Sequence, residues 1–307
     1  MKKVISVFSA LFILLSMAFA VTVNAANPIE PDRPASLTVQ YTFKDTNFAD
    51  LEINTYRIAE VFEDGTYALC DGFDHLQINI YGITEQSEWK AIAYTLASYI
   101  DADHIAPTYS ATTDKDGCAV FENIKTGMYL TTEKKVVNGE EHITFENFIT
   151  AVPSPSDEGE HLYDIKAFPK YSSYTPSKNE VEYKLIKQWK DTGVTDLRPQ
   201  TVTVDILKDG ELHSSVTLSP ENNWSYFWKN IDDGSVWQAV ERNISKDYLV
   251  TVEKAGYTFT VTNTCTQAPE NAPQTGNTAS YMPYLIIMSF SGLCIVLVAL
   301  ILKRKAR

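Results

Sequence analysis

Alternating apolar and polar positions run through most of the chain between its two ends. Residues 37–43 change from apolar to polar at every step, a period of two that predicts a half-buried strand. Similar short segments, such as 51–61 and 163–170, recur up to residue 170 and again across 181–264. Turn residues separate them, so the pattern predicts a mainly β protein.

One segment departs from the period of two. Its apolar residues recur at helical spacing and form one stripe: Trp89, Ile92, Ala93, Leu96, Tyr99 and Ile100. Thr84 is in a position to cap this helix, and Glu85 and Glu88 follow in its first turn, where acidic side chains favour the helix dipole. We interpret the stripe as a core-facing surface.

A turn signal lies at Asp114-Lys115-Asp116-Gly117. Its opening resembles a calcium loop, but the later ligands of such a loop are missing. Asp-Gly between two strand patterns predicts a hairpin turn.

A polar stretch divides the β segments into two groups. Residues 171–180 read as a linker. The first domain then covers 36–170 and the second covers 181–264. We therefore expect two Ig-like β-sandwich domains in tandem, the first with one inserted helix.

The N-terminus reads as a secretory signal. Two lysines precede an apolar run and then small residues, and residues 1–25 form the predicted signal peptide. Cleavage before Ala26 and cleavage after Ala20 both fit the small-residue pattern. Residues 26–35 are Pro-rich and polar, and we expect them to form a leader.

The C-terminus carries an uncharged apolar run of 22 residues, Tyr281 to Leu302, followed by a basic tail. About 20 such residues cross a bilayer as a helix, and the basic tail marks the cytoplasmic side. Residues 277–307 are therefore the predicted transmembrane segment and tail. Residues 265–276 form a spacer that ends in Pro273, Gln274, Thr275 and Gly276.

This ending resembles the sorting signal of Gram-positive surface proteins, in which Leu-Pro-any-Thr-Gly precedes a hydrophobic segment and a basic tail. The resemblance implies that a sortase cleaves between Thr275 and Gly276 and joins the threonine to an amine. The family's leucine is Ala272 here, which leaves the sortase class open. The other reading of this end is a plain single-span anchor.

Charge and motifs exclude several classes of function. The formal net charge is −13, which argues against nucleic acid as a partner. The five histidines have no metal-ligand spacing, and the sequence has no phosphate loop and no catalytic motif. We expect no metal, no cofactor and no enzyme activity.

Four cysteines are present, and Cys294 lies in the apolar run. Three cysteines in the exported part are too few for a disulfide framework. Cys70 and Cys118 share the first domain and an oxidising compartment, so a disulfide between them and two free thiols are both open.

Polar side chains are directed to the interior in the second domain. Lys187 shares a strand face with apolar residues such as Tyr183 and Leu185, and Asn263 shares a face with Phe259 and Val261. Glu241 follows Trp237 and Ala239 on another face. Because a buried lysine needs a partner or must lose its charge, these three residues form a candidate site.

The second domain resembles the B-type repeat of the collagen adhesin. The resemblance rests on residues 187–189, 198–204, 256–264 and the run Asn222-Asn223-Trp224-Ser225-Tyr226. It implies an internal amide between the Lys187 amine and the Asn263 carboxamide, assisted by Glu241. The other reading is a lysine that reaches solvent and an asparagine at a strand end.

The first domain resembles the N-terminal domain of sortase-assembled pilins. The resemblance rests on its opening strand, residues 117–123 and residues 165–170, the last similar to the pilin motif Val-x-Val-Tyr-Pro-Lys. It implies that Lys170 is the amine joined to the next subunit, although His161 replaces the family's tryptophan. Glu133 matches the acid of a B-type repeat, but no inward lysine accompanies it, so we expect no crosslink here.

These features predict a secreted protein attached covalently to a Gram-positive cell wall, as a minor or basal pilin subunit. The expected partners are a sortase and either peptidoglycan or other pilin subunits. A stand-alone adhesin that binds host matrix is the first alternative, and a surface enzyme is the second.

Overall fold

The computed structural model describes residues 27–156 and 159–267. The predicted signal peptide, sorting motif (273–276) and transmembrane segment (277–307) lie outside these residues. Within them, no helix is long and apolar enough to cross a membrane. The described chain is mainly β, with a single α-helix.

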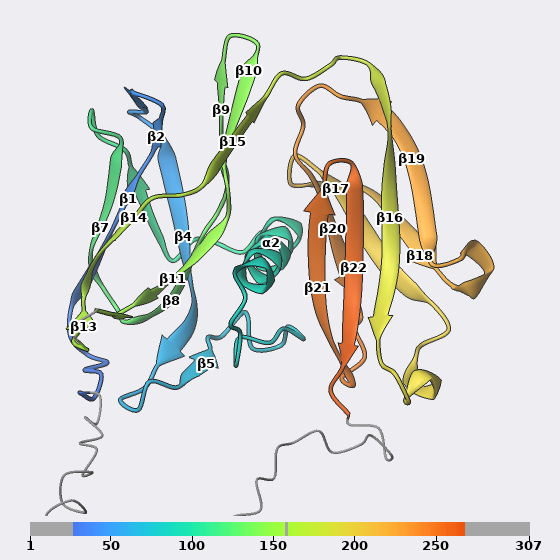
Figure 1. Cartoon of the computed structure of the whole chain (residues 1–307), viewed down its shortest axis with the longest axis horizontal. Coiled ribbons are helices and arrows are strands. Elements are labelled where there is room, and N and C mark those ends of the chain that lie inside the picture. The colour runs from blue at the N-terminus through green and yellow to red at the C-terminus, as the bar shows by residue number, and fades with distance from the viewer. Residues whose placement is uncertain (1–26, 157–158, 268–307) are drawn as a thin grey trace, which may run out of the picture. The chain divides into compact units, whose positions relative to one another are not determined.

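Two principal sheets form the N-terminal half (Figure 1). The strands of the first are, in spatial order, β14 (Asp164–Ala167), β1 (Ala35–Gln40) and β7 (Cys118–Ile124). The strands of the second are β11 (Phe148–Val152), β8 (Gly127–Thr131), β4 (Glu52–Val61) and β5 (Tyr67–Leu69), and β6 (Tyr109–Thr112) also pairs with β4. The opening and closing strands β1 and β14 are parallel neighbours.

Smaller sheets complete this half. One contains β15 (Tyr171–Tyr174), β10 (Glu141–Phe145) and β9 (Lys134–Asn138). Two further pairs are β2 (Thr42–Phe43) with β3 (Thr46–Asn47), and β12 (Ser154–Pro155) with β13 (His161–Leu162).

The C-terminal half is a sandwich of two sheets. One has the order β19 (Ser225–Ile231), β16 (Glu180–Lys190), β22 (Thr258–Cys265) and β21 (Tyr248–Ala255). The other has the order β18 (Glu211–Leu218), β17 (Val202–Lys208) and β20 (Trp237–Arg242). Two short 3-10 helices, η1 (Thr195–Leu197) and η2 (Pro220–Asn222), lie in its connections.

The alternating pattern explains where the cores lie. In the N-terminal half, Leu37, Val39, Tyr41 and Phe43 are all buried, as their period of two predicts. They belong to a core cluster that also draws residues from β4, β7, β8, β10 and β11. The apolar faces of these strands are therefore covered by one another.

The single helix, α2 (Gln86–Ala102), confirms the helical period. The N-cap is Glu85 and not Thr84, and its side chain makes no capping hydrogen bond, so the predicted cap is wrong. Five of the six stripe residues are buried, and Trp89 is half-buried. Ala91, Thr95, Ala97 and Ser98 are buried as well, so the helix is covered beyond the predicted stripe.

The second core cluster explains this additional burial. It combines α2 with β4 and β8 residues on one side and with the interior of the C-terminal sandwich on the other. The described residues 27–156, 159–191 and 195–267 accordingly belong to one compact unit. The helix inserted in the first half thus contributes to the core of the second.

Two local predictions need correction. Asp114–Gly117 does form a tight turn, with Gly117 N donating to Asp114 O at 2.9 Å and a positive φ at Gly117. The strands that it joins, β6 and β7, belong to different sheets, so it is not the turn of a paired hairpin. The first four residues of the expected linker 171–180 form β15, because Tyr171 packs edge-on against Phe145 and Phe43.

Candidate functional site

Lys187, Glu241 and Asn263 meet in the interior of the C-terminal sandwich. Lys187 lies on β16 and Asn263 on β22, the first and last strands of the sandwich, which are parallel neighbours. Glu241 comes from β20 in the facing sheet. Lys187 is 4% exposed, Glu241 is 2% exposed and Asn263 is 1% exposed, so all three are core residues.

The Glu241 carboxylate bridges the two nitrogen-bearing side chains. Its Oε2 lies 3.4 Å from Lys187 Nζ, and its Oε1 accepts a 2.8 Å hydrogen bond from Asn263 Nδ2. The first contact is within ion-pair distance but lacks hydrogen-bond geometry, since Oε2 has no hydrogen-bond partner among the described residues. Asn263 Oδ1 is also buried without a partner there.

Lys187 is incompletely satisfied for a buried ammonium group. Nζ donates to the backbone oxygens of Gln188 at 3.1 Å and Val261 at 3.4 Å, and it lies 4.2 Å from the centre of the Trp189 ring. An ammonium group has three strong donors, and long bonds to neutral carbonyls replace water poorly. The surroundings therefore favour the neutral amine.

Burial favours the neutral form of both titrating groups. It lowers the pKa of Lys187 to about 8, against the opposing effect of the Glu241 charge. Burial also raises the pKa of Glu241, opposed by Lys187 and by the hydrogen bond from Asn263. The free-energy cost of holding a neutral amine beside a protonated carboxyl is therefore smaller in this site than in water.

The backbone of Lys187 is held by the run that carries the family resemblance. Ser219 and Asn222 form a capping box around η2, and Asn223 and Trp224 then adopt left-handed φ angles of 53° and 55°. This turn directs the Trp224 carbonyl to the backbone N–H of Lys187, at 2.8 Å. The run is therefore a support for the site.

An ion pair between a buried aspartate and a half-buried arginine lies next to the site, and sequence reasoning missed it. Asp191 accepts two hydrogen bonds from Arg198, at 2.6 and 2.5 Å, and one from the Tyr248 hydroxyl at 3.0 Å. These bonds hold the pKa of Asp191 below its usual range. Arg198 also lies over the Trp189 ring at 5.5 Å, so the pair fixes the aromatic wall beside Lys187.

Lys170 lies apart from these residues and is exposed. It follows β14, and its backbone oxygen accepts a 2.8 Å hydrogen bond from Glu146 N. The preceding Pro169 is buried, so the backbone is anchored while the amine faces solvent. In the first domain, Glu133 has a raised pKa through burial, but no lysine in the described part of that domain is buried.

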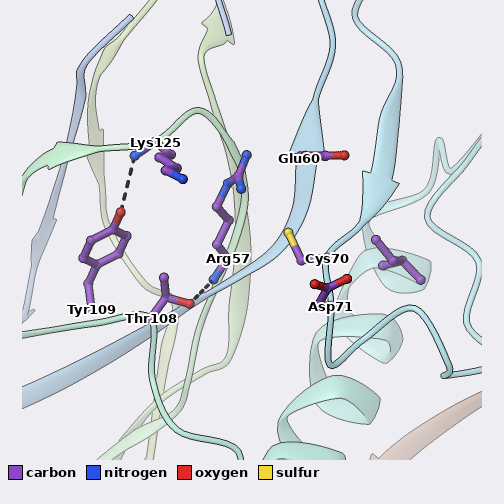
Figure 2. A pocket seen from close by; sticks show the side chains of 8 residues that line it. Arg57, Glu60, Cys70, Asp71, Thr108, Tyr109 and Lys125 are labelled. Carbon is purple, nitrogen blue, oxygen red and sulfur yellow. Dashed lines mark hydrogen bonds between the residues drawn. The ribbon is translucent and has the colours of Figure 1, made fainter. Parts of the chain in front are cut away.

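An open hollow of about 530 Å³ lies on the first domain. Figure 2 shows side chains that line it. Arg57 and Lys125 line it together with Glu60 and Asp71, so its charges are mixed. Arg57 Nε already donates to Thr126 O at 2.8 Å. Cys70 lies at its rim, and burial raises the pKa of this thiol, which makes it a poor nucleophile.

Cys70 and Cys118 are both free thiols. Cys70 follows β5 at the end of one sheet, whereas Cys118 opens β7 in the other sheet of the N-terminal half. The disulfide that the sequence left open is therefore absent from the structure. Among the described residues, no group of three or more histidine, cysteine or acidic side chains could hold a metal ion.

Comparison with known families identifies the second sandwich. Residues 183–264 match the family model described as Cna protein B-type domain. The collagen adhesin of Staphylococcus aureus is 27% identical over 107 residues, which are 34% of this chain and 9% of the adhesin. The chain thus spans less than a tenth of that relative, and the matched sandwich is a Cna B-type domain.

Two solved structures align with most of the described chain at low identity. A single B repeat unit of the S. aureus collagen-binding surface protein aligns at 13% identity and a TM-score of 0.27, covering 76% of this chain and all of that one. The full-length major pilin SpaD of Corynebacterium diphtheriae aligns at 14% identity and a TM-score of 0.30, and the alignment covers 77% of this chain and 65% of the pilin.

The state of the cysteines can be measured directly. We predict that alkylation of the denatured, unreduced full chain labels both Cys70 and Cys118, because neither is paired. Peptide mass spectrometry reads the label at each position, and a sample reduced beforehand is the control. Label that is found at these two positions only after reduction would establish a disulfide.

Proposed function

We propose that this protein is a cell-wall-anchored surface protein of a Gram-positive organism, a minor or basal pilin subunit stabilised by an internal Lys187–Asn263 amide. The observation that carries the crosslink is the Glu241 carboxyl, which contacts both Lys187 Nζ and Asn263 Nδ2. The similarity to a collagen adhesin supports a role at a cell surface.

The geometry suits a condensation that releases ammonia. The neutral Lys187 amine attacks the Asn263 carboxamide carbon, and the new C–N bond forms as the bond from that carbon to Nδ2 breaks. Glu241 accepts the surplus proton from Nζ on Oε2 and delivers a proton from Oε1 to the departing Nδ2. An amine and a primary amide become a secondary amide and ammonia, so atoms and protons balance without a co-reactant.

Attachment of the protein rests on its two ends and on Lys170. A sortase that cleaves after Thr275 would join the threonine to an amine of peptidoglycan or of another subunit. Lys170 would in turn receive the threonine of another subunit, since its amine is exposed and its backbone is anchored. A stand-alone adhesin would use the same C-terminal anchor but leave Lys170 free.

The crosslink has a mass signature. Trypsin digestion of the full chain should give a joined peptide that contains Lys187 and Asn263 and is lighter by one ammonia than its two parts. Lys187→Ala, Asn263→Ala and Glu241→Gln should abolish it. By analogy with a disulfide that closes a loop of this length, loss of the crosslink should lower the free energy of unfolding by about 4 kcal/mol. The melting temperature should then fall by roughly 10 °C.

Lys190→Ala is the matched control for this prediction. Lys190 lies on the same strand but is exposed, so the joined peptide should persist in this variant. Separate, unmodified peptides from the wild-type chain would contradict the crosslink.

Cleavage at the sorting motif can be read at the C-terminus. Protein released from the wall should end at Thr275, with the segment from Gly276 absent, because the acyl group is transferred at that bond. Thr275→Ala should leave the protein in the membrane fraction at its full length. Wall-associated wild-type protein that retains residues 281–302 would exclude this mode of attachment.

The joint between subunits is tested by Lys170→Ala in the native host. Immunoblots of wall extracts should lose the high-mass ladder that contains this protein, because an exposed amine is the acceptor. Lys166→Ala is the control, since Lys166 is exposed on the adjoining strand β14. A ladder that persists in the first variant and is lost in the second would move the joint to Lys166. A single band in the wild type would favour the stand-alone adhesin.

A further inference from the structure

The C-terminal sandwich has an open side, bounded by two edge strands. β20 ends one sheet and β21 ends the other, so each pairs with a neighbour on one side only. Edge strands carry unpaired backbone N–H and C=O groups, which otherwise bond to water or to another chain. In this protein, residues of the N-terminal half meet these groups.

On β21, two backbone N–H groups find acceptors outside the sandwich. Val252 N donates to the Thr95 hydroxyl of α2 at 2.7 Å, and Val250 N donates to the backbone oxygen of Gln77 at 2.7 Å. The same Thr95 hydroxyl donates to Ala91 O within the helix at 2.7 Å. The buried Thr95 hydroxyl in the middle of the helix therefore both donates and accepts a hydrogen bond.

On β20, two backbone oxygens find donors on the helix. The Tyr94 hydroxyl donates to Trp237 O at 2.9 Å, and the Tyr99 hydroxyl donates to Glu241 O at 2.6 Å. Two side chains of the same strand also contact the helix and the residue that follows it: Gln238 donates to Asp101 and Arg242 donates to Asp103, each at 2.6 Å. The contacts extend along the whole strand.

Tyr99 therefore holds the backbone of the residue whose carboxyl bridges Lys187 and Asn263. It is 4% exposed, and its neighbours Leu96 and Ile100 on the helix expose 1% and 2%. These apolar side chains belong to the same core cluster as the sandwich interior. The helix thus fills the open side by which water would reach Glu241.

We propose that helix α2 of the first domain is part of the crosslinking site of the second, with Tyr99 as the positioning residue for Glu241. This inference rests on the proposed Lys187–Asn263 amide. It predicts that the rate of bond formation depends on the docking of α2, a segment far from the B-type repeat in sequence.

The reactive pair must hold a neutral Lys187 and a protonated Glu241. The ion pair contains the same number of protons, so between the two pKa values the balance does not depend on pH. The ratio of the neutral pair to the ion pair depends on the difference between the two pKa values, and it changes about tenfold per pKa unit. Water that reaches the pair raises the pKa of Lys187 and lowers that of Glu241. In a plot of the rate of bond formation against pH, the plateau then falls, and the acid and alkaline limbs on its two sides move apart.

Other charges near the pair stay constant in the test. Asp191 and Arg198 face Lys187 from the end of β16 and the following loop, and Arg242 and Asp103 flank Tyr99. A Tyr99→Phe change removes a hydroxyl but none of these charges, and it keeps the ring that packs in the core. A displaced limb would therefore report access of water.

The experiment is cell-free synthesis of the full chain at a series of pH values. The appearance of the joined tryptic peptide is followed over time for the wild type, Tyr99→Phe and Tyr94→Phe. Tyr94→Phe is the matched control, because it removes the same kind of bond from the same helix to the same strand, four residues from Glu241. We expect Tyr99→Phe to lower the plateau roughly two- to tenfold and to spread its limbs. The control should keep the wild-type profile.

The outcomes separate the two proposals. A wild-type chain that never forms the joined peptide refutes the proposed amide itself. If the wild type forms the bond and Tyr99→Phe matches the Tyr94→Phe profile, the amide stands and the role of Tyr99 is refuted. Equal slowing by both variants, with unmoved limbs, shows a general loss of stability and also refutes it.

Discussion

The exclusion of water from one lysine nitrogen is the constraint on which this structure depends. Lys187 Nζ makes hydrogen bonds to two backbone carbonyl oxygens, and it also lies near an aromatic ring and one carboxylate oxygen. A charged amine in such a place costs several kcal/mol unless it is fully paired. A covalent bond to Asn263 would turn the buried amine into an amide nitrogen and release Asn263 Nδ2 as ammonia, while Asn263 Oδ1 would remain as the oxygen of the new amide. The site is an unfavourable arrangement that a reaction can relieve.

The same constraint explains why the helix of the first half belongs to the core of the second. A sandwich of four and three strands leaves one side open between β20 and β21. Glu241 lies on one of these edge strands, so the acid of the site is the member closest to that opening. Covering the edge with α2 satisfies its backbone groups and keeps the carboxyl dry. Edge protection and electrostatics are served by the same contacts.

Sequence reasoning found what depends on a period of two. The inward positions of Lys187, Asn263 and Glu241 follow from alternation along three strands, and their burial confirms them. It could not show that they meet, because that depends on pairing between residues far apart in the chain. Sequence reasoning also underestimated how much of α2 is buried, because the helix has a second buried face that consists of Ala91, Thr95 and Ser98. These small residues carry little hydrophobic signal, yet they allow close packing against a sheet. The resemblance to the B-type repeat pointed to three residues that the structure brings into contact. It covers only the second sandwich, so it gave no sign that the first half covers the open side of that sandwich.

The position of the site also bears on how the sandwich would carry load. The chain enters through β16 and leaves through β22, and these parallel neighbours would slide past each other if the two ends were pulled apart. An amide between Lys187 and Asn263 would pass the tension directly from one strand to the other. Everything between residues 188 and 262 would then lie outside the force path, including β20 and β21, to which α2 is docked. Without the bond, rupture of the β16–β22 pairing would load those strands and put the cover over Glu241 at risk. If the amide forms as proposed, docking of the helix would have to precede it, and the crosslink would then protect the contacts that favour its formation.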